Sequence, residues 1–284
     1  MHKSSFVSLL LALTIATAGS STARAQEGGD KDSPPLVPGK WLRIFTDEFD
    51  GQALDTNLWT NCYWWNDNGC TNLSSNELEW YMPANIKLSD GHLRLIARPE
   101  NVTGYKGRTF KYTSGMVTTG RDYRELPRPP RFSFQYGLVE IRAKLPGGKG
   151  IWPALWLLPS TRKSRPEIDI MEVLGDAPKQ LEMHFHYTDA TGKGRSTGQA
   201  AQTTDLTKDW HVYGLRWEPD AIVWYLDGVE KWRYSVVANI PREDMYLLMN
   251  LAVGGNWPGA PDEKTRFPAE FLIDYVRVWQ REPS

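Results

Sequence analysis

Apolar and polar residues alternate with a period of two along much of the chain from Trp41 onward. The run 138–145 shows this most clearly, because from Val139 to Leu145 the odd positions are apolar and the even positions are charged. Such a period indicates a β-strand with one buried face and one exposed face. Further strand-like runs, each bounded by turn residues, cover residues 92–97, 151–158, 167–172, 182–187, 210–218, 221–226, 246–253 and 271–279.

No amphipathic stretch longer than two helical turns interrupts these runs, and only residues 241–245 are expected to form a helical turn. The pairs Asp90-Gly91 and Asp227-Gly228 are typical of tight turns between strands. Many short strands without intervening helices favour antiparallel sheets packed as a sandwich. We therefore predict an all-β antiparallel β-sandwich that forms one domain over residues 41–281.

The first 40 residues have a different character. A lysine precedes an apolar run over residues 6–18, and Ala23-Arg24-Ala25 has the small-residue pattern of a signal-peptidase site. We expect residues 1–25 to be a signal peptide cleaved near Ala25 and the protein to be secreted. Residues 26–40 are rich in Gly, Asp, Ser and Pro, which predicts a flexible leader.

Charge and aromatic content narrow the classes of partner. Lys and Arg number 33 and Asp and Glu 34, and loss of the predicted signal peptide removes two basic residues, which leaves 31 minus 34, or −3. This balance favours neither nucleic acid nor an anionic membrane as a partner. The 13 Trp, 12 Tyr and 9 Phe are a large aromatic load, and aromatic faces stack on sugar rings as well as fill cores. The composition favours a polysaccharide ligand.

The chain contains two cysteines, Cys62 and Cys70, in a C-x7-C spacing. In an exported chain this local spacing favours one loop-closing disulfide, and two free thiols are the alternative. A metal site at these cysteines is not expected, because no further His or Cys lies nearby.

Candidate chemistry concentrates in the strand-like run 167–172, where three carboxylates alternate with Ile, Ile and Met. Like charges on one strand repel each other, so this composition lowers stability unless a function requires it. Glu167 and Asp169 share a face, but Glu172 lies at an odd offset from both and would point the other way in a regular strand. A β-bulge with Met171 as the extra residue would bring Glu172 to the same face.

With such a bulge, the Glu167 and Glu172 side chains could approach to about 5–5.5 Å, the separation that a retaining glycosidase requires. Asp169 would lie between them, and its charge would help to keep their two pKa values apart. An acidic surface strand and a cation site are the alternatives that spacing alone leaves open.

The sequence Glu-Ile-Asp-Ile-Met-Glu resembles the active-site strand of glycoside hydrolase family 16 in its bulged E-x-D-x-x-E form. Residues 147–159, 76–81, 251–257 and 273–278 are similar to further segments of that family. The resemblance runs from about Trp41 to Gln280 and is strongest to laminarinase-like endo-β-1,3-glucanases. It implies a β-jelly roll with an open cleft on the concave sheet, and hydrolysis with retention of configuration that needs no cofactor.

By position, the resemblance implies that Glu167 is the nucleophile, Glu172 the general acid/base and Asp169 an assisting group. It further implies substrate contacts by Asn76, Trp152, Trp156, His186 and Trp257, with His186 near the acid/base. The structural alternatives are a Trp in the core, an Asn that caps a turn and a buried His.

Members of the family often bind a structural calcium on the convex face. The matching positions in this sequence are Glu48, Gly91 and Asp274, and oxygen ligands from separate segments suit Ca²⁺. Hydrogen bonding of Asp274 within the sheet is the alternative.

Together these features predict a secreted, monomeric retaining endo-glycosidase that hydrolyses β-1,3-glucosidic bonds in laminarin-type β-glucans by double displacement. A mixed-linkage β-1,3-1,4-glucanase and a galactan-cleaving relative are alternatives within the same chemistry. A non-catalytic glucan-binding protein on the same sandwich is a third, although such proteins usually lack the glutamate pair present here.

Overall fold

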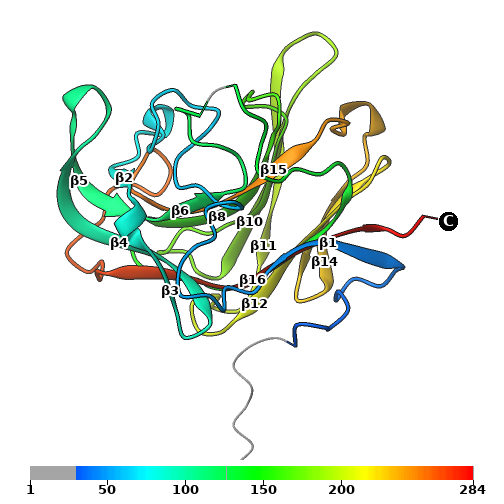
Figure 1. Cartoon of the computed structure of the whole chain (residues 1–284), viewed down its shortest axis with the longest axis horizontal. Coiled ribbons are helices and arrows are strands. Elements are labelled where there is room, and N and C mark those ends of the chain that lie inside the picture. The colour runs from blue at the N-terminus through cyan, green and yellow to red at the C-terminus, as the bar shows by residue number, and fades with distance from the viewer. Residues whose placement is uncertain (1–29, 126, 284) are drawn as a thin grey trace, which may run out of the picture.

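The structure is a computed structural model that describes residues 30–125 and 127–283, and within these ranges sixteen strands form two stacked sheets (Figure 1). One sheet contains β1 (Trp41–Asp47), β2 (Glu79–Tyr81), β3 (Ile86–Ser89), β4 (His92–Thr103), β5 (Thr109–Ser114), β7 (Gly137–Lys144), β12 (His211–Trp217), β13 (Ile222–Leu226), β14 (Val229–Tyr234) and β16 (Ala269–Arg281). The other contains β6 (Met116–Thr118), β8 (Ile151–Pro159), β9 (Glu167–Glu172), β10 (Gln180–Thr188), β11 (Gly194–Gln202) and β15 (Met245–Val253). Four short 3-10 helices are η1 (Leu73–Ser75), η2 (Pro83–Asn85), η3 (Tyr105–Gly107) and η4 (Val237–Asn239).

The strand order confirms the predicted antiparallel sandwich. The larger sheet runs β14-β13-β12-β7-β16-β4-β5-β2, with β1 also paired to β16 and β3 to β4. The smaller sheet runs β11-β10-β9-β8-β15-β6. The strand pairs are antiparallel throughout the described residues, apart from the parallel pair β2–β5.

The main core lies between the two sheets, because one face of each alternating strand is apolar. Ile168 of β9, Leu155 and Leu157 of β8 and Ile141 of β7 are fully buried in this core. Every second residue of β15 from Leu247 to Val253 points into the same core. The remaining residues of β8, β9, β10 and β15 therefore point to the outer face of the six-stranded sheet.

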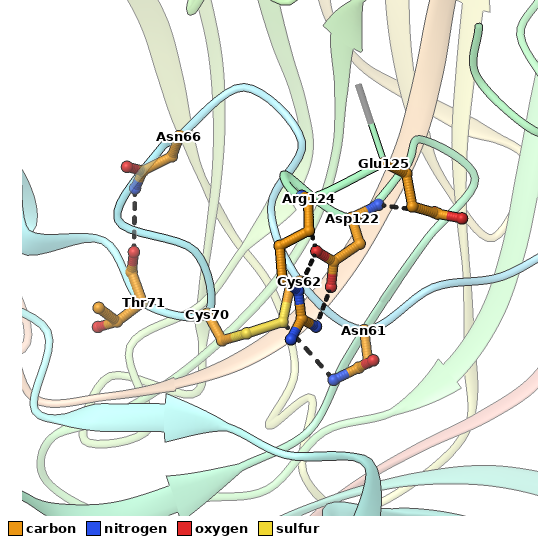
Figure 2. The surroundings of a disulfide bond; sticks show 8 residues. All are labelled: Asn61, Cys62, Asn66, Cys70, Thr71, Asp122, Arg124 and Glu125. Atoms are coloured by element: carbon orange, nitrogen blue, oxygen red, sulfur yellow. Dashed lines mark hydrogen bonds and ion pairs between the residues drawn. A yellow bond between two sulfur atoms is a disulfide. The ribbon is translucent and has the colours of Figure 1, made fainter. Parts of the chain in front are cut away.

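A second apolar cluster covers part of that outer face. Tyr63 and the two cysteines pack there against Trp156 of β8 and Tyr246 of β15. The predicted disulfide between Cys62 and Cys70 is formed, with the two Cα atoms 4.5 Å apart. The disulfide ties the loop that precedes η1 into a compact cover at one side of the outer face (Figure 2).

Near the disulfide, a charged pair holds a second loop, as Figure 2 also shows. The Arg124 guanidinium donates from Nε and Nη2 to the two carboxylate oxygens of Asp122, each at 2.6 Å. Asp122 is buried, so this two-point ion pair supplies the partners that its charge needs.

Three local features differ from the sequence prediction. Residues 241–245 form no helical turn, because the Met245 backbone instead exchanges two hydrogen bonds with Phe134 and begins β15. The strand β11 lies outside the predicted runs, since its residues are mostly polar and exposed at the sheet edge, and β1, β2, β3, β5, β6 and β14 lie outside them as well. The strands β4 and β16 extend beyond the predicted runs at residues 92–97 and 271–279.

The described part of the predicted flexible leader, residues 30–40, packs against the sandwich. The Leu36 backbone N–H donates to Glu140 Oε1 at 2.7 Å, and Val37 is buried beside Trp279. The predicted signal peptide at residues 1–25 lies outside the described residues. Among the described residues there is no helix with the length and apolarity needed to cross a bilayer.

Candidate active site

The β-bulge predicted for the acidic strand is present in β9. Against β8, Asp169 pairs with Trp156 and Met171 pairs with Leu155, so Ile170 is the residue without a partner on that side. Against β10 neither Ile170 nor Met171 has a partner, so the bulge comprises these two residues, one of which is the predicted Met171. Both side chains are buried in the core, which accounts for the arrangement, because two consecutive inward residues turn Glu172 to the outer face.

The three carboxylates consequently line one pocket of about 580 Å³ on the outer face of the six-stranded sheet. Alternate residues of the neighbouring strands complete its floor, from Trp152 to Trp156 on β8 and from Glu182 to His186 on β10. Trp257, which follows β15, also lines the pocket. The pocket therefore exists because several adjacent strands present their outward residues at the same level.

Glu172 is held at both carboxylate oxygens. The Trp152 indole Nε1–H donates to Oε1 at 3.1 Å, and His184 Nδ1 lies 2.7 Å from Oε2. Asp169 lies centrally, since its carboxylate falls within 4.8 Å of a Glu167 oxygen and within 4.8 Å of a Glu172 oxygen. The carboxylates are thus packed closely enough for each charge to affect the protonation of the others.

Burial raises the pKa of Glu167 well above its usual range, and the negative charge of Asp169 raises it further. Burial also raises the pKa of Asp169 well above its usual range, with the Glu172 charge as the second cause. The positive character of His186 and His184 opposes these two shifts in part. The pocket therefore retains protons at pH values where exposed carboxyl groups have lost them.

The His184 side chain experiences opposing influences. Its burial disfavours the charged imidazolium, but the hydrogen bond and the charge of Glu172 outweigh burial, and the pKa of His184 is raised. His184 therefore keeps its proton to higher pH than an unperturbed imidazole does.

Trp152, Trp156 and Trp257, the three predicted aromatic contacts, all line the pocket but differ in exposure. Trp257 is 41% exposed at the rim, and its ring meets Trp152 edge to face with centroids 5.5 Å apart. Trp156 is buried in the floor, where its Nε1–H donates to Asn250 Oδ1 at 2.7 Å. The rings of Trp152 and Trp257 are accessible to a ligand, whereas Trp156 also packs in the apolar cluster beneath the disulfide loop.

Asn76 does not line this pocket, and its contact with a sugar stays a prediction. Its backbone has φ +54° at the end of η1, and its side-chain Nδ2 donates to Asn256 Oδ1 at 2.7 Å. Asn76 therefore caps a turn and braces the segment that carries Trp257.

His186 lies in the pocket, but beside Asp169 and not beside Glu172. Its Nε2 is 3.2 Å from Asp169 Oδ2. Because β10 runs antiparallel to β9, its later residue His186 pairs with Glu167 and the earlier His184 reaches Glu172. His184 is not among the residues predicted from the sequence, although the His-x-His spacing places both rings on one strand face.

A buried acidic pair beneath the pocket was also missed. Glu77 and Glu79 are almost fully buried, and burial raises the pKa of both carboxyl groups. Glu79 Oε2 accepts a hydrogen bond from the Val253 backbone N–H at 2.8 Å, and Glu77 lines the pocket. In the sequence these residues fall in an ordinary polar loop, so only burial distinguishes them.

The residues proposed for a structural calcium have other partners. Glu48 accepts hydrogen bonds from the Arg277 guanidinium at 2.8 and 2.9 Å, and Asp274 accepts one from Arg142 at 2.6 Å. Gly91 occupies the turn between β3 and β4 with φ +74°. The arginines already supply the positive charge that these carboxylates need, so calcium binding stays a prediction that this arrangement does not favour.

Comparison with known proteins links this pocket to a family. Residues 108–277 match the family described as "Glycosyl hydrolases family 16". The chain is 34% identical to Glucan endo-1,3-beta-glucosidase A1 of Niallia circulans, over 87% of this chain and 39% of that protein. It is 33% identical to Endo-1,3-1,4-beta-glycanase EglC of Rhizobium meliloti, over 84% of this chain and 51% of that protein. This chain thus spans about half or less of the length of these two relatives.

A relative of similar size is Beta-glucanase of Rhodothermus marinus, 33% identical over 84% of this chain and 85% of that protein. Among solved structures, the laminarinase catalytic domain of Thermotoga maritima superposes with a TM-score of 0.74 at 33% identity, over 86% of this chain and 100% of that one. The endo-beta-1,3-glucanase of Pyrococcus furiosus superposes with a TM-score of 0.72 at 34% identity, over 88% of this chain and 100% of that one.

Proposed function

The chain belongs to glycosyl hydrolase family 16, and from this premise we propose that it is a retaining endo-β-1,3-glucanase acting on laminarin-type β-glucans. The observation that carries the proposal is the bulge in β9, which brings Glu167, Asp169 and Glu172 to one pocket. Paired carboxylates on one face are the machinery of glycoside hydrolysis.

In the proposed double displacement, Glu172 protonates the glycosidic oxygen while Glu167 attacks the anomeric carbon. The leaving chain departs, and a covalent glycosyl-enzyme forms. Glu172, now a carboxylate, takes a proton from water, and that water releases the sugar from Glu167 with retained configuration.

The hydrogen bonds in the pocket support this assignment of roles. Trp152 and His184 fix both oxygens of Glu172, which keeps the proposed acid/base in one orientation. The raised pKa of Asp169 keeps a proton on that group, and a neutral Asp169 removes one negative charge beside Glu167. Glu167 can then ionise and act as the nucleophile.

The aromatic rim supports a sugar ligand. The Trp152 and Trp257 rings stand edge to face above the carboxylates, where their exposed faces can stack on pyranose rings. The names of the relatives from Niallia circulans and Pyrococcus furiosus favour β-1,3 linkages. A mixed-linkage β-1,3-1,4-glucan is the second candidate substrate, because EglC carries that name at almost the same identity.

Release of reducing ends from laminarin, lichenan and agarose tests the substrate. We expect laminarin to be cleaved about tenfold faster than lichenan and agarose to stay intact, because relatives named as 1,3-β-glucanases or laminarinases share about a third of their residues with this chain. Proton NMR of the first products should show the β-anomer. Faster cleavage of lichenan would favour the second candidate, and an initial α-anomer would contradict double displacement.

We further propose that the protein is exported. The Ala23-Arg24-Ala25 pattern and the Cys62–Cys70 disulfide support this proposal, because disulfides persist in oxidising compartments. N-terminal sequencing of the protein recovered from a culture medium is the test, with Gln26 as the expected first residue.

A further inference from the structure

One end of the pocket holds a set of donor atoms that the proposed hydrolysis does not require in this form. Asp169, Glu172 and His184 each offer one ligand atom, and these three atoms lie within 4.8 Å of one another. We propose that this cluster binds a transition-metal dication such as Zn²⁺ and that the bound ion blocks the pocket against the polysaccharide.

The donor types fit such an ion. Imidazole nitrogen and carboxylate oxygen are both donor types that bind zinc, and three protein ligands leave a fourth position open. His184 Nδ1 and Glu172 Oε2 are 2.7 Å apart and share a proton in a hydrogen bond. An ion that replaces this proton needs the two atoms about 3.3 Å apart for tetrahedral bonds of about 2.0–2.1 Å, which is a small separation of the pair.

The Asp169 side chain also favours a cation at this place. It is only 5% exposed, and its Oδ2 atom has no hydrogen-bond partner among the described residues. His186 Nε2 is 3.2 Å away from this oxygen but does not meet it with hydrogen-bond geometry. A buried oxygen without a hydrogen-bond partner is a costly group, and a bound cation can take the place of the proton on Asp169.

Neighbouring residues limit the orientation of the His184 ring, as is usual for a histidine that binds a metal. With Nδ1 facing Glu172, the other ring nitrogen Nε2 lies 3.9 Å from Glu182 Oε2. This distance is beyond a direct hydrogen bond, but the negative charge of Glu182 behind the distal nitrogen favours this orientation of the ring and increases its basicity as a ligand. Gly198 of β11 makes room for this ring, because a Cβ atom there would approach His184 Cδ2 to 2.3 Å.

The consequence for catalysis rests on the proposed function, whereas metal binding itself does not. A metal bound to Glu172 Oε2 prevents this carboxyl group from giving a proton to a glycosidic oxygen. It also occupies space between the carboxylates where the sugar must sit. Zn²⁺ should therefore compete with the polysaccharide, raising KM and leaving kcat unchanged.

Isothermal titration of the full chain with ZnCl₂, without polysaccharide and in a non-chelating buffer, tests the site directly. We expect one Zn²⁺ per chain. His184→Gln should weaken the affinity by about 100-fold through loss of the nitrogen ligand, and Glu182→Gln by about 10-fold through loss of ring orientation.

The matched control is His211→Gln. His211 Nδ1 lies 2.8 Å from Asp227 Oδ2 in the other sheet, which makes it a histidine–carboxylate pair outside both of the three-residue ligand groups. Its replacement should leave the Zn²⁺ affinity within about twofold of the parent value. Thermal melting with and without Zn²⁺ confirms that each variant is folded, and the ion should raise the melting temperature of the parent but not of His184→Gln.

Several outcomes would overturn the site: no binding to the parent chain, equal affinity in the parent and His184→Gln, or loss of affinity in His211→Gln alone. A decrease in kcat caused by Zn²⁺ without a change in KM would contradict competition between the ion and the polysaccharide. Zn²⁺ binding that depends on His184 in a protein without glucanase activity would support the site and contradict the proposed function, so the two failures are distinguishable.

Discussion

At the scale of single residues, chemically identical groups differ because their neighbours differ. Glu167 and Glu172 belong to the same short strand, yet Glu172 is hydrogen-bonded by Trp152 and His184 while Glu167 faces Asp169 and His186. Burial raises the pKa of Glu167 well above its usual range, so its ionisation depends on which neighbour holds a proton. The roles of the two glutamates can therefore be separated by experiment.

Glu172→Gln removes the proposed acid, and Glu167→Gln removes the proposed nucleophile. Both variants should lose laminarin hydrolysis by a factor of at least about 10³, because each displacement step needs its group. On an aryl β-glucoside whose leaving group needs no proton, Glu172→Gln should still form the glycosyl-enzyme, detectable by mass spectrometry. Glu167→Gln should not form this adduct, and the reverse result would exchange the two roles.

Glu140 provides a residue-scale test of stability against pH. It is 2% exposed on β7, and burial raises its pKa to about 7 despite hydrogen bonds from Leu36 and Val37. The folded state therefore binds more protons than the unfolded state between about pH 4.5 and 7, so the unfolding free energy falls as pH rises through this window.

Glu140→Gln should remove this fall. The variant should gain up to about 3 kcal/mol of unfolding free energy relative to the parent between pH 4 and pH 8, measured by urea denaturation at both values. Glu230→Gln, at an exposed position on β14, serves as the control and should show no such difference. A gain that is the same at both pH values would contradict the assignment.

At the scale of elements, the β9 bulge decides which face each carboxylate occupies. Residues at even offsets share a face, so Glu167 and Asp169 lie on the same face of a regular strand. Glu172 lies on that face as well, because Ile170 and Met171 both point inward. The bulge thus changes which face the residues after it occupy, while β9 stays paired with both of its neighbouring strands.

Deletion of Ile170 tests this view. The shortened strand would read Glu-Ile-Asp-Met-Glu, in which all three carboxylates share a face without a bulge. We expect the variant to retain activity on laminarin well above that of Glu172→Gln, and to lose about 2–4 kcal/mol of stability through the missing core side chain. Activity as low as that of Glu172→Gln in a folded deletion variant would contradict the parity argument.

At the scale of the whole molecule, the pocket is assembled from segments that are far apart in sequence. Asn76 and Asn256 are joined by a hydrogen bond of 2.7 Å across 180 residues, and this contact braces the rim next to Trp257. The disulfide loop covers the other part of the outer face and bounds the pocket through Tyr63. Substrate binding should therefore depend on contacts between loops as well as on the groups that touch a sugar.

A double-mutant cycle separates bracing from direct contact. Trp257→Ala should raise KM for laminarin about tenfold through lost stacking, and Asn76→Ala should raise it less by loosening the same segment. If Asn76 acts through Trp257, the double variant should be no worse than Trp257→Ala. Additive effects on KM would show instead that Asn76 contacts the polysaccharide itself.

The sequence by itself determined the features that depend on local order. Alternation indicated which residues of several strands face the core, the spacing of Glu167, Asp169 and Glu172 predicted a bulge if all three share a face, and the short C-x7-C interval favoured the disulfide; the bulge and the disulfide are both present. Each of these follows from the period of a strand or from the short reach of a few residues, so no distant partner is needed.

Only the tertiary structure decided which distant groups meet. The antiparallel register of β10 against β9 pairs His184 with Asp169 and His186 with Glu167, and from these positions the two rings contact Glu172 and Asp169 respectively. Strand order likewise gives Glu48 and Asp274 arginine partners and turns Asn76 toward Asn256. These contacts depend on which strands lie side by side and in what register, and one strand's own alternation carries no information about its neighbours.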